Sequence, residues 1–303
     1  MKKLILLLCM LCPLFAAAQE TYPFVQRDSA LHLDIHRPAG TPNGYTVLHV
    51  FGGGFVSGSR NTQWDAAYCR QMADLGYTVV SIDYRLGLRG VRKVGITNVA
   101  PLENAFYMAA EDCSAAVRYL VEHAGELGID ADKIILEGVS AGAITVLMTD
   151  FGRCNHLAYT AELPEGWKPA GVVAYSGAIY SVYGALKWAD KPAPTLLFHG
   201  MEDKIVPYHQ IAVGKRGLYG ANSIVKRLDK FSYPYCVYRF LGLGHEVCMG
   251  GPKTPEEFNL FVSEYIAAAR ELFKDITFRD ASIRSSKFTY LTLRDIYKKQ
   301  KLQ

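Results

Sequence analysis

Ser140 stands in a G-x-S-x-G pentapeptide at residues 138–142, a spacing in which serine can act as a nucleophile. The apolar run at residues 134–137 predicts a buried strand before it, and residues 141–150 predict a helix after it. A turn between these elements strains the serine backbone and exposes its hydroxyl, while the flanking glycines avoid Cβ clashes. The pentapeptide alone also fits a helix start capped by serine, but the surrounding strand and helix favour the nucleophile.

Three consecutive glycines, 52–54, follow another predicted strand at residues 46–50. When a serine attacks a carbonyl carbon, backbone N–H groups must hold the negative oxygen that develops, and a glycine loop can turn its amides inward. We expect the amides of Gly53, Gly54 and Ala141 to form this oxyanion hole. Taken alone, a glycine triplet is also typical of a flexible turn.

A nucleophilic serine also needs a base and an acid that orients the base. His245, which follows Gly244 just beyond a predicted strand, is the candidate base, and Asp203, in the loop after another strand, is the candidate acid. Glu202 is the alternative acid. The other histidines are expected in structural or surface positions: His32, His36, His49, His123, His156, His199 and His209.

The sequence predicts neither a metal nor a cofactor, because a serine triad requires none. The five cysteines after residue 18 form no C-x-x-C motif and no His/Cys cluster with zinc spacing. The 33 basic and 29 acidic residues are dispersed along the chain, which argues against nucleic acid as a partner. Asp83 and Asp112 are expected to be structural hydrogen-bond acceptors.

The elements that must position these residues follow an α/β pattern, since short β-branched runs alternate with longer amphipathic ones. This pattern predicts one mainly parallel sheet with helices on both faces. Strands are predicted at residues 31–36, 46–50, 78–83, 134–137, 171–175, 195–199 and 236–240. Helices are predicted at residues 64–75, 103–123, 141–150, 208–219, 222–230 and 255–273.

The 303 residues, half of them hydrophobic and without internal repeats, predict a single catalytic domain at residues 19–275. Residues 276–303 form a basic C-terminal extension, for which we expect partial order and a strand around 288–293. The sequence leaves the oligomeric state of the protein open.

Residues 1–18 read as a signal peptide, with Lys2 and Lys3 before an apolar run and Ala16 to Ala18 at the cleavage site. We expect export to the periplasm or beyond, without an integral membrane anchor, because the apolar run is short. Cleavage near Ala18 would lower the formal charge from +4 to +2. A buried N-terminal helix is the alternative.

An odd number of cysteines remains after the signal peptide, so at least one of them must be unpaired. Export to an oxidising compartment would allow two disulfides, whose pairing stays open. The five cysteines are Cys69, Cys113, Cys154, Cys236 and Cys248.

Six motifs together resemble those of the α/β-hydrolase superfamily, and more closely those of secreted carboxylesterases of the hormone-sensitive-lipase and bacterial acetylxylan/feruloyl esterase type. They are Phe51-Gly-Gly-Gly-Phe55, Ser-Ile-Asp-Tyr-Arg-Leu at 81–86, Asp-Cys-Ser-Ala-Ala-Val at 112–117, Gly-Val-Ser-Ala-Gly at 138–142, His-Gly-Met-Glu-Asp-Lys-Ile-Val-Pro at 199–207 and Gly244-His245. The resemblance covers residues 30–274. It implies Ser140 as nucleophile, His245 as base and Asp203 as the acid.

Two positions depart from the family pattern. Phe51 stands where the family usually has a loop-bracing histidine, and Ala143 stands where the elbow often has glycine. Phe51 leaves the donors of Gly53 and Gly54 available, but their exact placement stays open.

Three functions fit these motifs. The first is an exported serine esterase, and the second is a serine exopeptidase resembling the prolyl-oligopeptidase type. The third is a binding protein on an inactive hydrolase fold, which the presence of all three triad members disfavours. We expect no large cap domain. Tyr180, Tyr183 and Trp188 can form an aromatic rim, and ordinary surface packing of these side chains is the alternative. These features favour short or aromatic acyl groups on a glycan or similar small-molecule ester.

Overall fold

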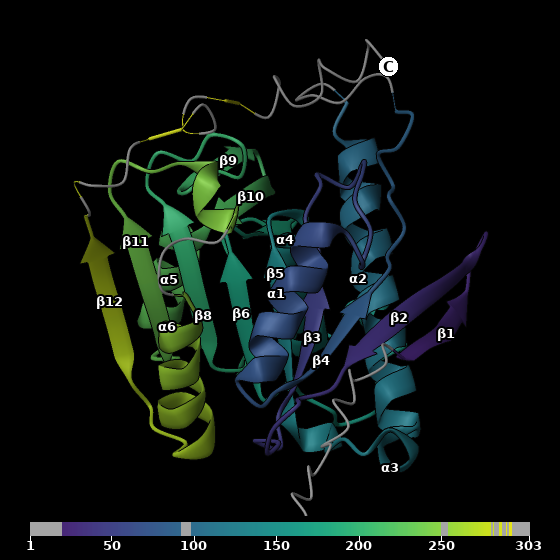
Figure 1. Ribbon diagram of the computed structural model, residues 1–303. Helices are drawn as coiled ribbons and strands as arrows, with labels where there is room; N and C mark the ends of the chain where they lie inside the picture. The colour runs from purple at the N-terminus through teal and green to yellow at the C-terminus, as the bar shows by residue number, and fades with distance from the viewer. Residues whose placement is uncertain are drawn as a thin grey trace, which may run out of the picture.

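The computed structural model describes residues 20–91, 98–249, 254–279, 281, 285–286, 289 and 291–292. Within them, nine strands form one sheet in the order β1, β2, β4, β3, β5, β6, β8, β11, β12 (Figure 1). The contacts of β1 with β2 and of β2 with β4 are antiparallel, and all the others are parallel. The strands are β1 Glu20–Gln26, β2 Ala30–His36, β3 Thr46–Val50, β4 Thr78–Ile82, β5 Ile134–Val139, β6 Gly171–Tyr175, β8 Thr195–Gly200, β11 Tyr235–Phe240 and β12 Phe273–Phe278. The predicted mainly parallel sheet is confirmed.

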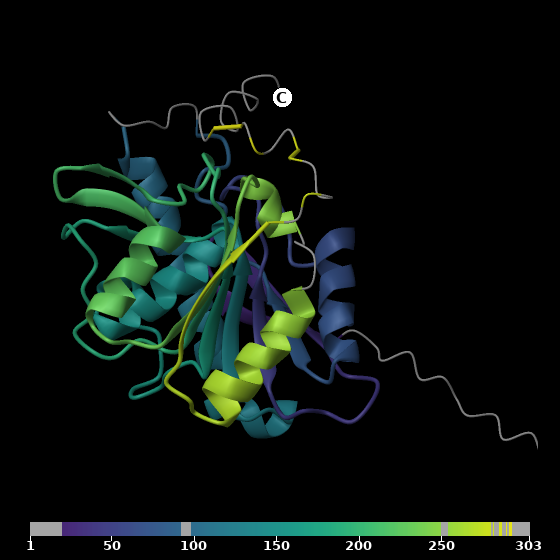
Figure 2. The ribbon, with the colours of Figure 1, turned by 90° about the vertical axis from the view of Figure 1, so that its left-hand side faces the viewer.

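Helices cover both faces of the sheet, with α1 and α6 on one face and α2, α4 and α5 on the other (Figure 2). The described helices are α1 Gln63–Asp74, α2 Ala100–Glu122, α3 Ala124–Leu127, α4 Ala141–Cys154, α5 Ala221–Lys230 and α6 Thr254–Phe261. Single turns of other helix types are Ala131–Lys133, Ala158–Thr160, His245–Met249 and Val262–Ala267.

The central strands β3, β4, β5 and β6 are buried along their whole length. Their sequences are runs of valine, isoleucine, leucine and other apolar residues, as expected for parallel strands that are covered on both faces. Since these strands are parallel, their carboxyl ends meet at one edge of the sheet, and the loops at that edge carry the candidate site.

A second, antiparallel sheet lies on the side of the main sheet that α4 and α5 cover, toward the carboxyl ends of the parallel strands (Figure 1, Figure 2). It consists of β7 Ala178–Ser181, β10 Arg216–Gly220 and β9 Gln210–Val213, in that order. The prediction of a helix at residues 208–219 is therefore wrong. The chain turns back at Gly214, where φ is 59°, and β10 pairs with β9 on one side and with β7 on the other.

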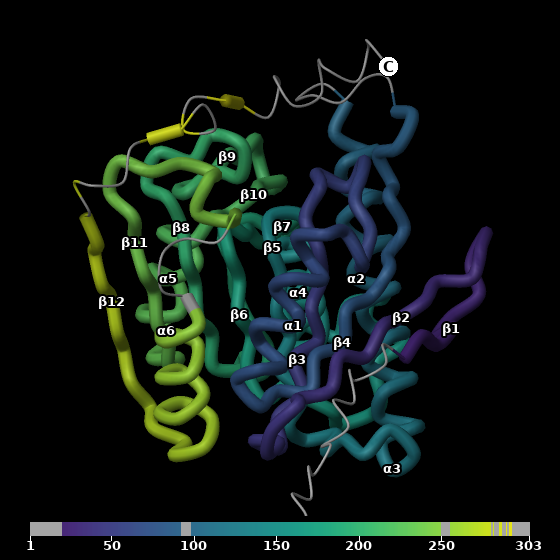
Figure 3. Tube along the Cα trace, in the orientation of Figure 1, coloured from purple at the N-terminus to yellow at the C-terminus, as the bar shows by residue number. Residues whose placement is uncertain are grey.

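The prediction lacks the two edge strands of the main sheet, β1 and β12, whereas β2 is confirmed as the strand predicted at residues 31–36. The β1–β2 hairpin and β12 lie at opposite ends of the sheet (Figure 3). The predicted helix at 255–273 is too long, because α6 and its following turn end at Ala267 and the chain enters β12 at Phe273. The sheet thus continues beyond residue 275 to Phe278. The strand predicted at 288–293 falls largely outside the described residues.

The signal-peptide segment, residues 1–18, lies outside the described residues. Among the helices that are described, none has the length and apolar character needed to cross a bilayer. The five cysteines after residue 18 are all buried and free, so none of the disulfides considered above is present.

Candidate active site

Ser140 lies in the sharp turn that joins β5 to α4. Its φ of 54° and ψ of −112° are a strained conformation for a residue with a side chain, and its backbone N–H donates to the Tyr175 carbonyl at 2.9 Å. A Cβ at Gly138 would lie 2.3 Å from the Gly142 carbonyl oxygen, and one at Gly142 would lie 1.9 Å from the Val50 carbonyl oxygen. Both positions therefore require glycine, because the backbone at Gly138 lies against Gly142 and the backbone at Gly142 lies against the end of β3.

His245 and Asp203 reach Ser140 from the loops that follow β11 and β8. The Ser140 Oγ lies 2.8 Å from His245 Nε2, and His245 Nδ1 lies 2.8 Å from Asp203 Oδ2. Because an ionised carboxylate only accepts, the Nδ1–H donates to Asp203, which leaves Nε2 to accept the hydroxyl hydrogen of Ser140. All three side chains are buried or nearly so. The structure thus brings together the three residues that were predicted as nucleophile, base and acid.

Asp203 is held at both carboxylate oxygens. Oδ1 accepts the backbone N–H groups of Ile205 and Val206 at 2.9 and 3.0 Å, and Oδ2 faces His245. Burial alone would raise the pKa of Asp203, but hydrogen bonds from His199 and His245 outweigh burial and keep this pKa below its usual range. The alternative acid, Glu202, is exposed, and its backbone N–H donates to the Leu243 carbonyl of the base loop at 2.9 Å.

The pKa of His245 is shifted upward. Burial alone would lower it, whereas the neighbouring Cys248 sulfur and the Asp203 carboxylate raise it above the ordinary histidine value. The carboxylate stabilises the imidazolium form, which is the form that a general base takes after it has removed a proton.

The loop Gly52 to Gly54 lies against the nucleophile turn. A Cβ on Gly52 would be 3.1 Å from the Val139 carbonyl oxygen and 3.4 Å from the Cβ of Ser140. Gly53 and Gly54 have φ values of 126° and 63°, and the Gly53 carbonyl accepts the amides of Val56 and Ser57. Ala141 opens α4 and is buried. The three predicted oxyanion donors therefore all lie in the loop and turn that meet at Ser140, and their role stays a prediction.

Phe51 braces the glycine loop by packing. Its buried ring stacks on Tyr84 with 4.4 Å between ring centroids, and the Tyr84 hydroxyl donates to the Phe51 carbonyl at 3.0 Å. A Cβ at Gly58 would lie 2.7 Å from the Phe51 ring, so the end of the loop closes directly over it. An aromatic stack thus stands where the related family usually has a histidine. The other departure, Ala143, is buried in α4, where its Cβ packs closely against Gly177.

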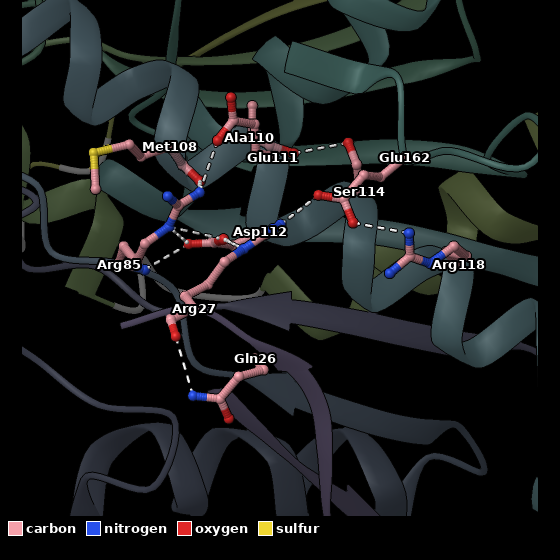
Figure 4. Close-up of polar contacts among 10 residues, drawn as sticks. All are labelled: Gln26, Arg27, Arg85, Met108, Ala110, Glu111, Asp112, Ser114, Arg118 and Glu162. Atoms are coloured by element: carbon pink, nitrogen blue, oxygen red, sulfur yellow. Dashed lines mark hydrogen bonds and ion pairs between the residues drawn. The ribbon is translucent and has the colours of Figure 1, made fainter. Parts of the chain in front are cut away.

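Asp112 and Asp83 are structural acceptors, as predicted. Asp112, fully buried on α2, accepts from Arg27 at 3.0 Å and from the backbone and side chain of Arg85 at 2.8 to 3.0 Å (Figure 4). Asp83 accepts from the Arg60 guanidinium at 2.6 Å and from the His32 amide at 3.3 Å. The Asp112 contacts fasten α2 to the segments that follow β1 and β4.

A buried charged cluster beneath the site was not predicted. The ring of His49, on β3, contacts Glu137 on β5 through Nδ1 at 2.5 Å and Asp65 on α1 through Nε2 at 3.1 Å. His49 is one of the histidines that were expected in structural or surface positions. The two residues are far apart in the sequence, and it is the parallel register of β3 and β5 that sets His49 beside Glu137.

Ser286, Thr289 and Thr292 of the C-terminal extension lie on the base and acid loops. Glu246 accepts the Ser286 amide at 3.3 Å and the hydroxyl of Thr289, and Lys204 pairs with Thr292 in a single parallel bridge. Gly244 has no room for a side chain, because its Cβ would lie 2.6 Å from the Cα of Thr289.

The predicted aromatic rim is wrong for two of its three members. Tyr180, on β7, is 4% exposed and Trp188 is 8% exposed, whereas Tyr183 is 68% exposed. Pairing of β7 with β10 turns Tyr180 inward, where its hydroxyl donates to Glu103 at 3.1 Å. Among the described residues, no group of three or more histidine, cysteine, aspartate or glutamate side chains is arranged to hold a metal ion.

Comparison with known proteins identifies the fold. Over 81% of its length the chain superimposes on an esterase from the Planctomycetes species Thermogutta terrifontis, Est2, covering 92% of that structure with a TM-score of 0.58 at 20% sequence identity. This chain has the α/β-hydrolase fold. The same esterase phosphonylated by sarin gives a TM-score of 0.55 at 19% identity, covering 84% of this chain and 95% of that structure.

Sequence comparisons match part of this chain. Residues 33–162 match the BD-FAE family model. An arylesterase of Saccharolobus solfataricus is 37% identical over 138 residues, which is 45% of this chain and 40% of the relative. The hormone-sensitive lipase of Bos taurus is 30% identical over 152 residues, 49% of this chain and 18% of the relative. The chain therefore spans less than half the length of these curated relatives. The predicted resemblance to the superfamily and to hormone-sensitive-lipase-type esterases is confirmed.

Proposed function

We propose that this chain is a serine carboxylesterase that works through an acyl-enzyme. The observation that carries the proposal is the continuous chain of contacts from Ser140 Oγ to His245 Nε2 and from His245 Nδ1 to Asp203 Oδ2, both at 2.8 Å. The named relatives, which include an arylesterase and a hormone-sensitive lipase, support the same reaction class.

In this mechanism His245 takes the hydroxyl proton of Ser140 while Oγ bonds to the carbonyl carbon of the ester. The negative oxygen that develops is held by the amides of Gly53, Gly54 and Ala141. His245 then gives its proton to the alcohol oxygen as the carbon–oxygen bond breaks. A water molecule repeats both steps on the acyl-enzyme and releases the carboxylic acid, so Ser140 and His245 return to their starting states.

We further propose short or aromatic acyl groups on a bulky alcohol such as a glycan. In the described part of the chain, the segments after β6 and β8 build the small sheet of β7, β10 and β9 and the ten-residue helix α5, but no long helical cap. An acyl chain not covered by a cap would leave each added methylene partly in water, so each would contribute well below the roughly 0.8 kcal/mol of full burial. The signal-like residues 1–18 support export as the setting of this activity.

The test is a panel of acetyl, butyryl, octanoyl and feruloyl esters together with aminoacyl anilides, turned over by the wild type and by Ser140→Ala. We expect ester hydrolysis with kcat/KM that does not rise from acetyl to octanoyl, little anilide hydrolysis, and a loss on the order of 10⁴ in Ser140→Ala. Faster turnover of anilides would favour the exopeptidase, and a steady rise toward octanoyl would contradict the substrate proposal. Equal ester turnover by Ser140→Ala would contradict the mechanism.

A further inference from the structure

A second histidine, His199, faces the proposed catalytic acid from the end of β8. Its ring is buried, with the residue 1% exposed. Its Nε2 lies 3.1 Å from the Val206 carbonyl oxygen and 3.3 Å from Asp203 Oδ2. A carbonyl and an ionised carboxylate can only accept, so Nε2 must carry a hydrogen that it donates between them.

The His199 ring is itself held in place. Tyr208 packs against it edge to face, with ring centroids 5.7 Å apart, and the Tyr208 hydroxyl accepts from Arg239. Arg239 lies directly beside His199 in the register of β11 and β8, and it forms two contacts with Asp275 at 2.5 and 2.8 Å. The orientation of the imidazole is thus fixed from the neighbouring strand.

Each carboxylate oxygen of Asp203 consequently faces two hydrogen-bond donors. The amides of Ile205 and Val206 hold Oδ1, and two imidazoles, His245 at 2.8 Å and His199 at 3.3 Å, share Oδ2. Rotation of the carboxylate would break at least one of these bonds. The Oδ2 that receives the Nδ1–H of His245 is therefore held from a second side.

We propose that His199 is a positioning residue for the reaction proposed above: its Nε2–H holds Asp203 toward His245 and takes up part of the carboxylate's negative charge. This inference rests on the proposed function, because it assigns a role to Asp203 and His245 as acid and base. His199 touches neither Ser140 nor the attacked carbonyl in this mechanism, so it acts only through Asp203.

Removing the His199 donor has two consequences. The carboxylate gains freedom to rotate, which lowers kcat more than it changes KM. Its negative charge also acts more fully on His245, which favours the imidazolium and moves the acid limb of kcat/KM to higher pH. The charged and titratable groups that face His199 are Asp203, Tyr208 and Arg239, with His245 beyond the shared carboxylate. Of these, only Asp203 contacts both histidines.

The experiment compares three variants of the full chain. His199→Phe fills the space without a donor, and His199→Gln keeps an N–H. Tyr238→Phe is a matched control, because it removes a hydroxyl from the neighbouring strand β11 at a ring that stacks on Phe198 and not on His199. We expect His199→Phe to lower kcat about tenfold, with little change in KM, and to raise the acid limb by about half a pH unit. His199→Gln should recover most of both effects, and Tyr238→Phe should leave the acid limb where it is.

Proton and nitrogen NMR of the resting protein supplies a readout that needs no turnover. The downfield proton between His245 Nδ1 and Asp203 should move in His199→Phe and return in His199→Gln. In the wild type, the nitrogen shifts of His199 should show a protonated Nε2 even if His199→Phe fails to fold. An unprotonated Nε2, or a folded His199→Phe with an unchanged proton resonance and acid limb, would overturn the role of His199. Absence of wild-type esterase activity would instead count against the proposed function alone.

Discussion

Asp203 and Glu202 show how two neighbouring carboxylates can have different roles. Both follow the same strand, and their sequence positions alone do not separate the catalytic acid from its neighbour. The structure buries Asp203 against His245 and leaves Glu202 exposed. The difference arises because the backbone amides of Ile205 and Val206 turn toward Asp203, which directs its second oxygen at the base loop.

This difference predicts a matched pair of substitutions. Asp203→Asn should reduce kcat by up to about 10⁴ with the fold intact, because an amide favours the wrong imidazole tautomer of His245. Glu202→Gln makes the same chemical change one residue away and should stay within about twofold of the wild type. Steady-state ester hydrolysis and circular dichroism of both variants are the measurements. A larger loss in Glu202→Gln would exchange the two assignments.

The residues of the site differ in how far sequence alone could locate them. Ser140 has a local signal, since strand, turn and helix all lie within a few residues of it. His245 lies 105 positions from Ser140 and could be assigned only by chain order and by the resemblance to a family. The pair His49 and Glu137, 88 positions apart, had no such pattern to mark it. Its recognition depends on the register between two parallel strands, which local sequence does not encode.

At the scale of elements, the His49 cluster joins the two strands that lead into the site. β3 continues into the glycine loop, and β5 continues into Ser140. Helix α1, which packs on one face of these strands, supplies Asp65 to the cluster. Burial alone would lower the pKa of His49, but the two carboxylates, Glu137 and Asp65, raise it to about 9. The buried imidazolium therefore holds β3, β5 and α1 together by charge.

This cluster predicts a loss of stability at alkaline pH. Because the folded-state pKa is raised above the unfolded value of about 6.5, the stabilisation is complete below that value and disappears as pH rises through about 9. It amounts to about 3 kcal/mol. Urea unfolding at pH 7 and pH 10 should show a greater decline in the free energy of unfolding for the wild type than for His49→Gln, which cannot titrate. Equal declines in the two proteins would show that His49 is not the group responsible.

The elements that sequence reasoning misassigned share a physical cause. Residues 208–219 form the β9–β10 hairpin because β10 pairs with β7, which is more than 30 positions earlier in the chain. Likewise β12 forms because it adds a parallel neighbour to β11. In both segments long-range pairing decides the structure, whereas the strands of the buried sheet centre were recognisable from their own apolar runs.

At the scale of the whole molecule, the parallel sheet is what assembles the site. The loops after β3, β5, β8 and β11 all leave the sheet at the edge where parallel strands end, and they carry the glycine loop, Ser140, Asp203 and His245. The alternation of strands and helices in the sequence predicted this architecture. The strand order, and with it the adjacency of β8 and β11 that sets Asp203 beside His245, became known only from the structure.

The central claim is that Ser140 is the nucleophile, and covalent labelling tests it most directly. The wild type is incubated with a fluorophosphonate ester, and the intact mass and the modified peptide are determined by mass spectrometry, with Ser140→Ala treated in parallel. We predict one phosphonyl group per chain, attached to Ser140, and no labelling of Ser140→Ala. A phosphonyl group on another residue, or equal labelling of Ser140→Ala, would contradict the account.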